Sequence, residues 1–208
     1  MYDFRANLIL GFHGCDEETR DKLVNQPQEI HGSDKSHEWL GHGMYFWENN
    51  VERAWLWAHE KKARGELRTP SVVGAVLQLG HCCDLLDSKF IKVLKNHYQG
   101  MEKAFRDARI DLPKNIDIKT DPNKDKLLRI LDCITIEFMH SEINIEIEKD
   151  RKAKGYSEIP KFDSTRGMFQ EGAPVFEGSG IFEKSHIQIC IRNPDCIKGF
   201  FIPRKSKQ

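Results

Sequence analysis

The sequence predicts an α+β protein with strands near both ends of the chain and helices between them. Strand-length apolar runs, several of them rich in β-branched or aromatic residues, lie at 5–12, 41–47, 71–79, 186–192 and 197–202. Residues 88–110 and 124–142 instead repeat apolar side chains at helical spacing. The length of 208 residues suits one domain with elaborations. We therefore expect a single domain over residues 1–208, with a helical insertion at about 84–160.

Composition excludes several classes of protein. Basic and acidic residues number 32 each, and mean hydropathy is −0.59. No stretch approaches the roughly 20 apolar residues that span a bilayer, and the N-terminus lacks the features of a signal peptide. We expect a cytoplasmic protein with no membrane partner. Zero net charge argues against nucleic acid binding over the whole surface, but it leaves room for a local basic groove.

The first half of the chain alternates strand and helix signals. The run at 5–12 predicts a buried strand that delivers His13 to its edge, and an acidic cap predicts a short helix over 16–25. Residues 26–41 contain proline, glycine and serine and are predicted to form a long loop. Asn49 or Asn50 then caps a helix that ends at Gly65, and the strand at 71–79 follows.

The second half is helical before strands resume. Helices are predicted over 88–110 and 124–142, followed by a solvated helix end and linker over 143–161. The glycine-rich segment 162–180 lacks periodicity and is predicted to be an exposed functional loop.

Cysteine and histidine patterns favour no metal site. The six cysteines are sparse for this length, and without a secretory signal we expect free thiols. His31, His37 and His42 fall in or beside one loop, without the tight paired spacing of structural zinc ligands.

Three separated pieces of sequence carry the functional signal. They are FHGC at residues 12–15, GHGMYFWEN at 41–49 with its following helix, and HIQICIR at 186–192. In this order they resemble the ADP-ribosyltransferase family, in its diphtheria-toxin-like and poly(ADP-ribose) polymerase-like branch. The resemblance spans roughly residues 8–202, except for the helical insertion. It implies a split mixed or antiparallel β-sheet and NAD+ as a substrate.

The resemblance assigns roles to individual residues. His13 would bind the adenosine ribose, the Gly14 backbone would grip the nicotinamide carboxamide, and Tyr45 would stack on nicotinamide. Trp57 would form a second aromatic wall if one residue is inserted, whereas strict helical spacing would choose Trp55; we prefer Trp57. Gln188 falls where the family usually has a glutamate, so the motif is His-Tyr-Gln.

Glutamine at position 188 changes the expected chemistry. It binds a ribose hydroxyl, but it has no negative charge to stabilise an oxocarbenium-like transition state and cannot act as a base. We therefore expect transfer of a single ADP-ribose, with another carboxylate activating the acceptor. The candidates are Glu171, which we prefer, Glu177 and Asp163. Arg166 and Lys184 are candidates for contacts with pyrophosphate or target.

The function expected from this resemblance is mono-ADP-ribosylation of a macromolecule, RNA or protein, as in toxins of toxin–antitoxin or phage-defence systems. An antitoxin or chaperone protein would then be a partner. Basic residues of the insertion would line one flank of an RNA groove; they are Lys89, Lys92, Lys95, Lys103, Arg106 and Arg109. Two alternatives stay open. One is a non-catalytic module that binds NAD, ADP-ribose or a partner, and the other is an NAD+ glycohydrolase.

Overall fold

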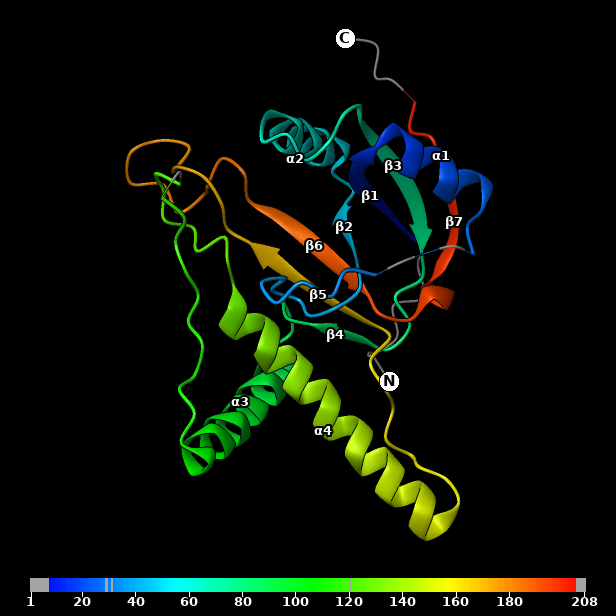
Figure 1. The fold of residues 1–208 in the computed structure, drawn as a ribbon, viewed down its shortest axis with the longest axis vertical. Coiled ribbons are helices and arrows are strands. Elements are labelled where there is room, and N and C mark those ends of the chain that lie inside the picture. Colours follow the sequence, from blue (N-terminus) through cyan, green and yellow to red (C-terminus); the bar gives the residue numbers. More distant parts are fainter. Residues whose placement is uncertain (1–7, 29, 31, 120, 205–208) are drawn as a thin grey trace.

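A computed structural model describes residues 8–28, 30, 32–119 and 121–204, and it is a mixed α and β protein. Its described residues include one seven-stranded mixed sheet in the order β4-β5-β6-β2-β1-β3-β7 (Figure 1). All neighbouring strands are antiparallel except β4 and β5. The strands are β1 (Ile9–Asp16), β2 (Met44–Glu48), β3 (Pro70–Leu77), β4 (Cys82–Asp84), β5 (Ser164–Phe169), β6 (His186–Ile191) and β7 (Ile197–Phe201).

Four α-helices in the described part of the chain cover the sheet, with a short 3-10 turn η1 (Pro194–Cys196) before β7. Figure 1 shows α2 beside β1 and β2, and α3 with α4 near β4 and β5. No helix among the described residues is long and apolar enough to cross a membrane. The helices are α1 (Glu17–Asn25), α2 (Val51–Ala63), α3 (Ser88–Ala108) and α4 (Ile130–Lys154).

Side-chain alternation along the strands assigns the helices to two faces of the sheet. Trp47 of β2 packs with Ala54 of α2, whereas the preceding Phe46 packs with Leu23 of α1. Successive strand residues point to opposite faces, so α1 and α2 cover opposite faces. On β6, Cys190 belongs to a core cluster with residues of α3 and α4. Gln188 is two positions before Cys190, so both point to the same face, and Gln188 is the register partner of Trp47. The face toward α2, α3 and α4 therefore carries the motif residue of β6.

The first strand begins and ends later than the sequence predicted. β1 runs over Ile9–Asp16, so His13 lies inside the strand rather than after it, and residues 5–7 lie outside the described residues. All eight residues of β1 pair with β3, which explains the extension. Asp16 ends the strand and caps α1, as expected.

The second predicted helix of the insertion is shifted. It was expected over 124–142, but α4 runs from Ile130 to Lys154. It cannot start at 124 as predicted, because Lys124 and Lys126 have left-handed backbones, with φ of 57° and 51°. It continues further because ion pairs at helical spacing support its charged end, which stops at Gly155; the pairs are Lys149–Glu146, Arg151–Glu148 and Lys154–Asp150.

The predicted functional loop at 162–180 is a strand in its first part. β5 pairs with β6 at six positions, and Ser164 and Thr165 are fully buried. Partners from other elements satisfy two of its buried polar side chains, whereas Thr165 Oγ1 has no hydrogen-bond partner. Ser164 Oγ donates to Leu79 O at 2.6 Å, and Arg166 binds Glu48 and Asp84. The segment after Phe169 forms a loop, as predicted.

All six cysteines are free thiols, and all are buried. They lie on different elements of the core, which are β1, β4, α4, β6 and η1. Burial raises the pKa of Cys15 and of Cys83 to about 12. The cysteines therefore act as small apolar core residues.

Candidate functional site

The candidate site lies where β1 and β2 separate. These strands pair only at Gly11–Glu48 and Phe12–Trp47, while β1 continues along β3 and β2 along β6. His13 bridges the gap, with its Nδ1 2.8 Å from Tyr45 O. A carbonyl only accepts, so Nδ1 donates and Nε2 of the neutral ring stays an acceptor. Burial lowers the pKa of His13, although the Tyr45 hydrogen bond partly offsets this, so the ring is neutral near pH 7.

Gly14 is in close contact with helix α2. A Cβ on Gly14 would lie 2.4 Å from Ala54 O and 3.2 Å from Trp57 Cε3. No larger side chain fits without moving the helix, because a backbone oxygen cannot turn away. Close packing of α2 on β1 therefore explains this glycine, independently of any contact with a cofactor.

Trp57, and not Trp55, faces the gap between β1 and β2. The Trp57 ring centroid lies 6.3 Å from that of His13 and 5.3 Å from that of Trp47, and Lys61 Nζ sits 4.2 Å above it. Trp55 is 37% exposed and stacks on His59 of its own helix. Of the two sequence candidates, Trp57 is the one that the fold brings to His13.

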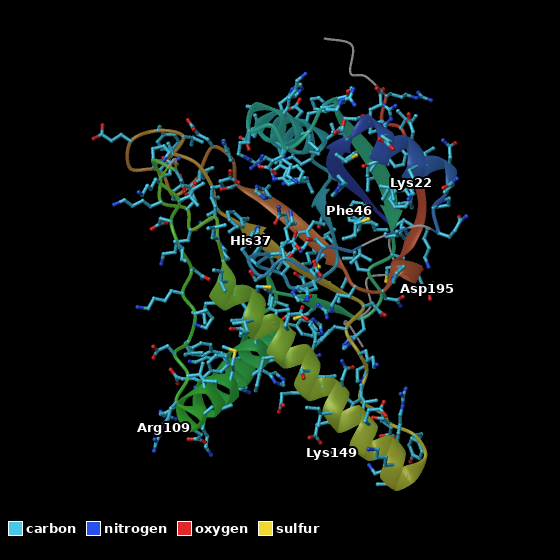
Figure 2. All side chains as sticks on the ribbon, viewed as in Figure 1. Lys22, His37, Phe46, Arg109, Lys149 and Asp195 are labelled. Carbon is cyan, nitrogen blue, oxygen red and sulfur yellow. The ribbon has the colours of Figure 1, made fainter. Side chains whose placement is uncertain are left out.

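Tyr45 holds the long loop before β2 against the sheet. Its hydroxyl donates to Gly41 O at 2.8 Å and accepts from Leu40 N at 2.9 Å. The ring packs against the core formed with α3 and α4, and burial raises the pKa of the phenol. In Figure 2, His37 marks this loop in front of the sheet. Tyr45 thus lies beside the split, as we call the gap between β1 and β2, and its hydroxyl is already bonded to the loop.

Gln188 lies directly opposite Trp47 in the β2–β6 register. Its Oε1 accepts a hydrogen bond from Trp39 Nε1 at 2.6 Å. Its Nε2 donates to no described residue. The amide oxygen is therefore bonded, and the amide nitrogen is available as a donor. No local pattern indicated Trp39 as the partner of Gln188, since the two residues are 149 positions apart.

Glu171 is not the exposed loop carboxylate that the sequence predicted. It is 8% exposed, and both oxygens accept from Arg53 Nη2, at 2.8 and 2.6 Å. Arg53 is equally buried, and Lys184 Nζ lies 3.8 Å from Glu171 Oε1. The loop after β5 is thereby attached to α2, which is why this carboxylate points inward.

The other charged candidates also have structural partners. Arg166, expected to contact pyrophosphate or target, is buried between Glu48 and Asp84. Asp163 accepts from His81 N and Asn193 Nδ2, which ties β5 to neighbouring turns. Lys184 pairs with Glu60 of α2 at 2.9 Å. Glu177 is exposed on the loop.

Sequence analysis did not predict a cluster of buried polar atoms that lies near Trp47, on β2, β6 and α2. Trp47 Nε1, Arg53 Nε, Arg53 Nη1 and His186 Nε2 are all buried without a hydrogen-bond partner. His186 Nδ1 donates to Lys184 O at 2.6 Å, so its unpartnered Nε2 is an acceptor. Burial, assisted by Arg53 and Arg129, lowers the pKa of His186 to about 4. Donors and an acceptor therefore meet here on neighbouring strands and α2.

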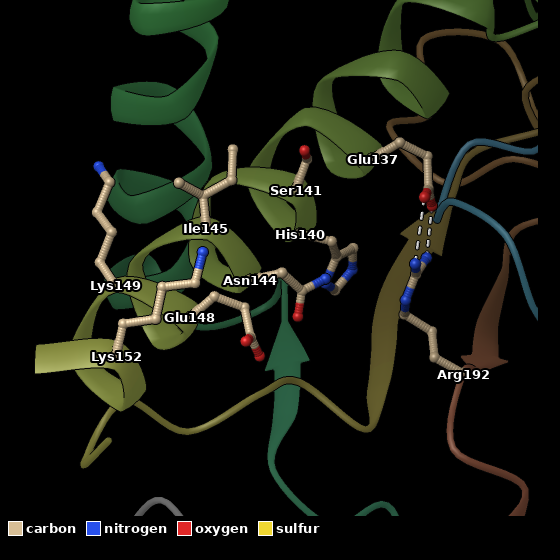
Figure 3. A pocket seen from close by; sticks show the side chains of 9 residues that line it. All are labelled: Glu137, His140, Ser141, Asn144, Ile145, Glu148, Lys149, Lys152 and Arg192. Atoms are coloured by element: carbon tan, nitrogen blue, oxygen red, sulfur yellow. Dashed lines mark hydrogen bonds and ion pairs between the residues drawn. The ribbon is translucent and has the colours of Figure 1, made fainter. Parts of the chain in front are cut away.

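Two cavities lie away from these residues. Figure 3 shows a cavity of about 640 Å³ along α4, where Glu137 pairs with Arg192 at one end and Lys149 and Lys152 lie at the other. A second cavity of about 370 Å³ lies before α4, at the base of the loop after β5. Neither is lined by His13, Tyr45 or Gln188. Within the described part of the chain, which excludes His31, no group of three or more His, Cys, Asp or Glu side chains could hold a metal ion.

Comparison with known proteins gives a distant relative. An uncharacterized protein of Methanocaldococcus jannaschii is 22% identical over 202 residues, covering 90% of this chain and 83% of that protein. No family model matches the chain. No solved structure gives a significant match.

Proposed function

We propose that this protein is a mono-ADP-ribosyltransferase that transfers ADP-ribose from NAD+ to a macromolecule. The observation that supports the proposal best is the split between β1 and β2. Around it lie His13, Tyr45 and Gln188, the three motif residues of the sequence resemblance, with Trp57 across from His13. Three distant segments of sequence thus contribute to one place.

The proposed reaction is substitution at C1′ of the nicotinamide ribose. The C1′–N bond breaks, nicotinamide leaves as a neutral molecule with the electron pair, and an acceptor oxygen or nitrogen bonds to C1′ and loses its proton. The leaving group is cationic before the bond breaks, so no general acid is required. Orientation of the NAD+ supplies much of the rate enhancement. Glu171 is paired with Arg53, so it could accept the proton only after that pair opens.

Labelled NAD+ tests the proposal directly. The protein is incubated with NAD+ labelled in the adenosine half, together with separated RNA and protein fractions, and free nicotinamide is measured in parallel. Label in one fraction with release of nicotinamide supports transfer. Free ADP-ribose alone would indicate a glycohydrolase. Absence of both products would favour a non-catalytic binding module, which the uncharged Gln188 keeps open.

Tyr45→Ala tests the placement of the site. Removing the aromatic face should lower the rate of nicotinamide release by up to about tenfold, since one aromatic contact is worth roughly 0.5–1.5 kcal/mol. Tyr45→Phe keeps the ring and loses only the two hydrogen bonds to the loop, so it should retain more activity. Tyr156→Ala, at an exposed position, is the control. Full activity in Tyr45→Ala would refute this placement.

A further inference from the structure

The cavity before α4 has the chemistry of an anion site. It has a volume of about 370 Å³ and lies between the segment leading to α4 and the loop after β5. Its lining has three basic and two acidic side chains, two amides and an aromatic ring; the residues that would contact a ligand are Lys124, Lys126, Arg129, Gln170 and Phe182.

We propose that this cavity binds a phosphate-bearing nucleotide of a single-stranded nucleic acid. The basic side chains would hold the phosphate, and the Phe182 ring would stack on a base, which is how single strands are commonly bound. The volume lies within the usual range for small-ligand sites. Exposed Gln170 at the rim offers both donor and acceptor to a base edge.

The two carboxylates in the lining already have partners. Asp125 Oδ2 accepts from Gly172 N at 2.9 Å, and Asp132 Oδ1 accepts from Asn115 Nδ2 at 2.8 Å. By contrast, no described residue forms an ion pair with Lys124 or Lys126, and both lysines are exposed. Three basic and two acidic side chains line the cavity, so its net formal charge is +1.

Arg129 is the deepest cation of the cavity. Its Nε is buried without a partner, while its Nη1 lies 3.9 Å from Asp132 and its Nη2 donates to Asp125 O at 3.4 Å. Burial lowers the pKa of this guanidinium. An anion in the cavity would supply the missing acceptor and offset the cost of desolvation.

The backbone fixes the two lysines at the cavity mouth. Lys124 and Lys126 both adopt left-handed φ values, which cost roughly 1–2 kcal/mol each for residues with side chains. Hydrogen bonds hold the turn: Asp125 N donates to Asp121 Oδ2 at 2.7 Å, and Lys126 N donates to Asp117 Oδ1 at 3.0 Å. The turn lies just before the N-terminal end of α4, whose dipole also favours an anion.

The cavity adjoins the candidate site through Arg129. This guanidinium lies 5.4 Å from the Trp39 ring, and Trp39 Nε1 donates to Gln188 Oε1. Two side chains, Arg129 and Trp39, would thus connect a nucleotide in the cavity to Gln188. The inference that this nucleotide is the acceptor of ADP-ribose rests on the proposed function, whereas the inference that the cavity binds a nucleotide does not.

Fluorescence anisotropy with a short labelled single-stranded RNA, in the absence of NAD+, tests the proposal. The double variant Lys124→Gln/Lys126→Gln and the single variant Arg129→Gln should each bind about tenfold more weakly than wild type. Each lost phosphate contact should reduce the slope of log affinity against log salt by about 0.7. The matched control Lys149→Gln/Lys152→Gln changes two lysines in the other cavity and should bind like wild type. Circular dichroism checks that each variant is folded.

Several results would overturn the proposal. They are no binding of RNA by wild type, equal weakening in the control variant, or a phosphopeptide binding as tightly as RNA through the same lysines. A DNA oligonucleotide of the same sequence tells whether the ribose hydroxyl contributes, and tight binding of either strand supports the site. Nicotinamide release is measured on the same proteins, so that the two proposals are tested separately. Binding of RNA by a wild-type protein that releases no nicotinamide would refute only the proposed function.

Discussion

At the scale of single residues, Gly14 has two possible explanations, one from packing and one from function. The resemblance would have its backbone grip a carboxamide, whereas in the fold a Cβ at this position would meet Ala54 O and Trp57. Gly14→Ala should lower the free energy of unfolding by about 1–3 kcal/mol, the usual cost of overpacking. Gly199→Ala on β7 is the control, since a Cβ there meets nothing within 4 Å. Urea unfolding measures both, and equal stability of the two variants would remove the packing explanation.

At the scale of elements, the loop after β5 is attached to α2 by the Arg53–Glu171 pair. Breaking a buried pair leaves an uncompensated charge and costs about 3–5 kcal/mol. Glu171→Gln should therefore lower the free energy of unfolding by several kcal/mol in urea, and Glu177→Gln at an exposed position should not change it measurably. If Glu171→Gln kept full stability but lost transfer, Glu171 would regain the catalytic role that the sequence suggested.

The elements also show what the sequence could predict. Strands with continuous apolar runs, such as β3, were recognised because local pattern and burial agree. β5 was missed because its buried Ser164 and Arg166 are satisfied by partners more than 80 positions away, which no local pattern reveals. The motif roles of His13 and Gln188 were predicted from sequence order and stay predictions, whereas Trp39, the partner of Gln188, is brought there by the tertiary fold.

At the scale of the whole molecule, two buried histidines link stability to pH. Burial lowers the pKa of His140 and of His186 to about 4, from 6.5 in the unfolded chain. Between these values the unfolded state binds more protons, so stability is constant above pH 6.5 and falls as the pH drops toward 4. Each histidine accounts for up to about 3 kcal/mol of this loss.

Urea unfolding between pH 8 and pH 4 measures this dependence. His140→Asn and His186→Asn should each show a shallower acid slope than wild type, whatever their stability at neutral pH. The difference in slope isolates one histidine from the carboxylates that titrate in the same range. Slopes identical to wild type in both variants would contradict the assignment of these two groups.

Because every cysteine is buried, thiol labelling can report local unfolding of the protein. A thiol-alkylating reagent finds no exposed target in the folded protein, so labelling proceeds only when a core element detaches. Because the thiols are spread over β1, β4, α4, β6 and η1, the order in which they are labelled ranks these elements by the ease with which each leaves the core. Conversely, a single cysteine introduced on the surface would be a unique attachment point for a spectroscopic probe.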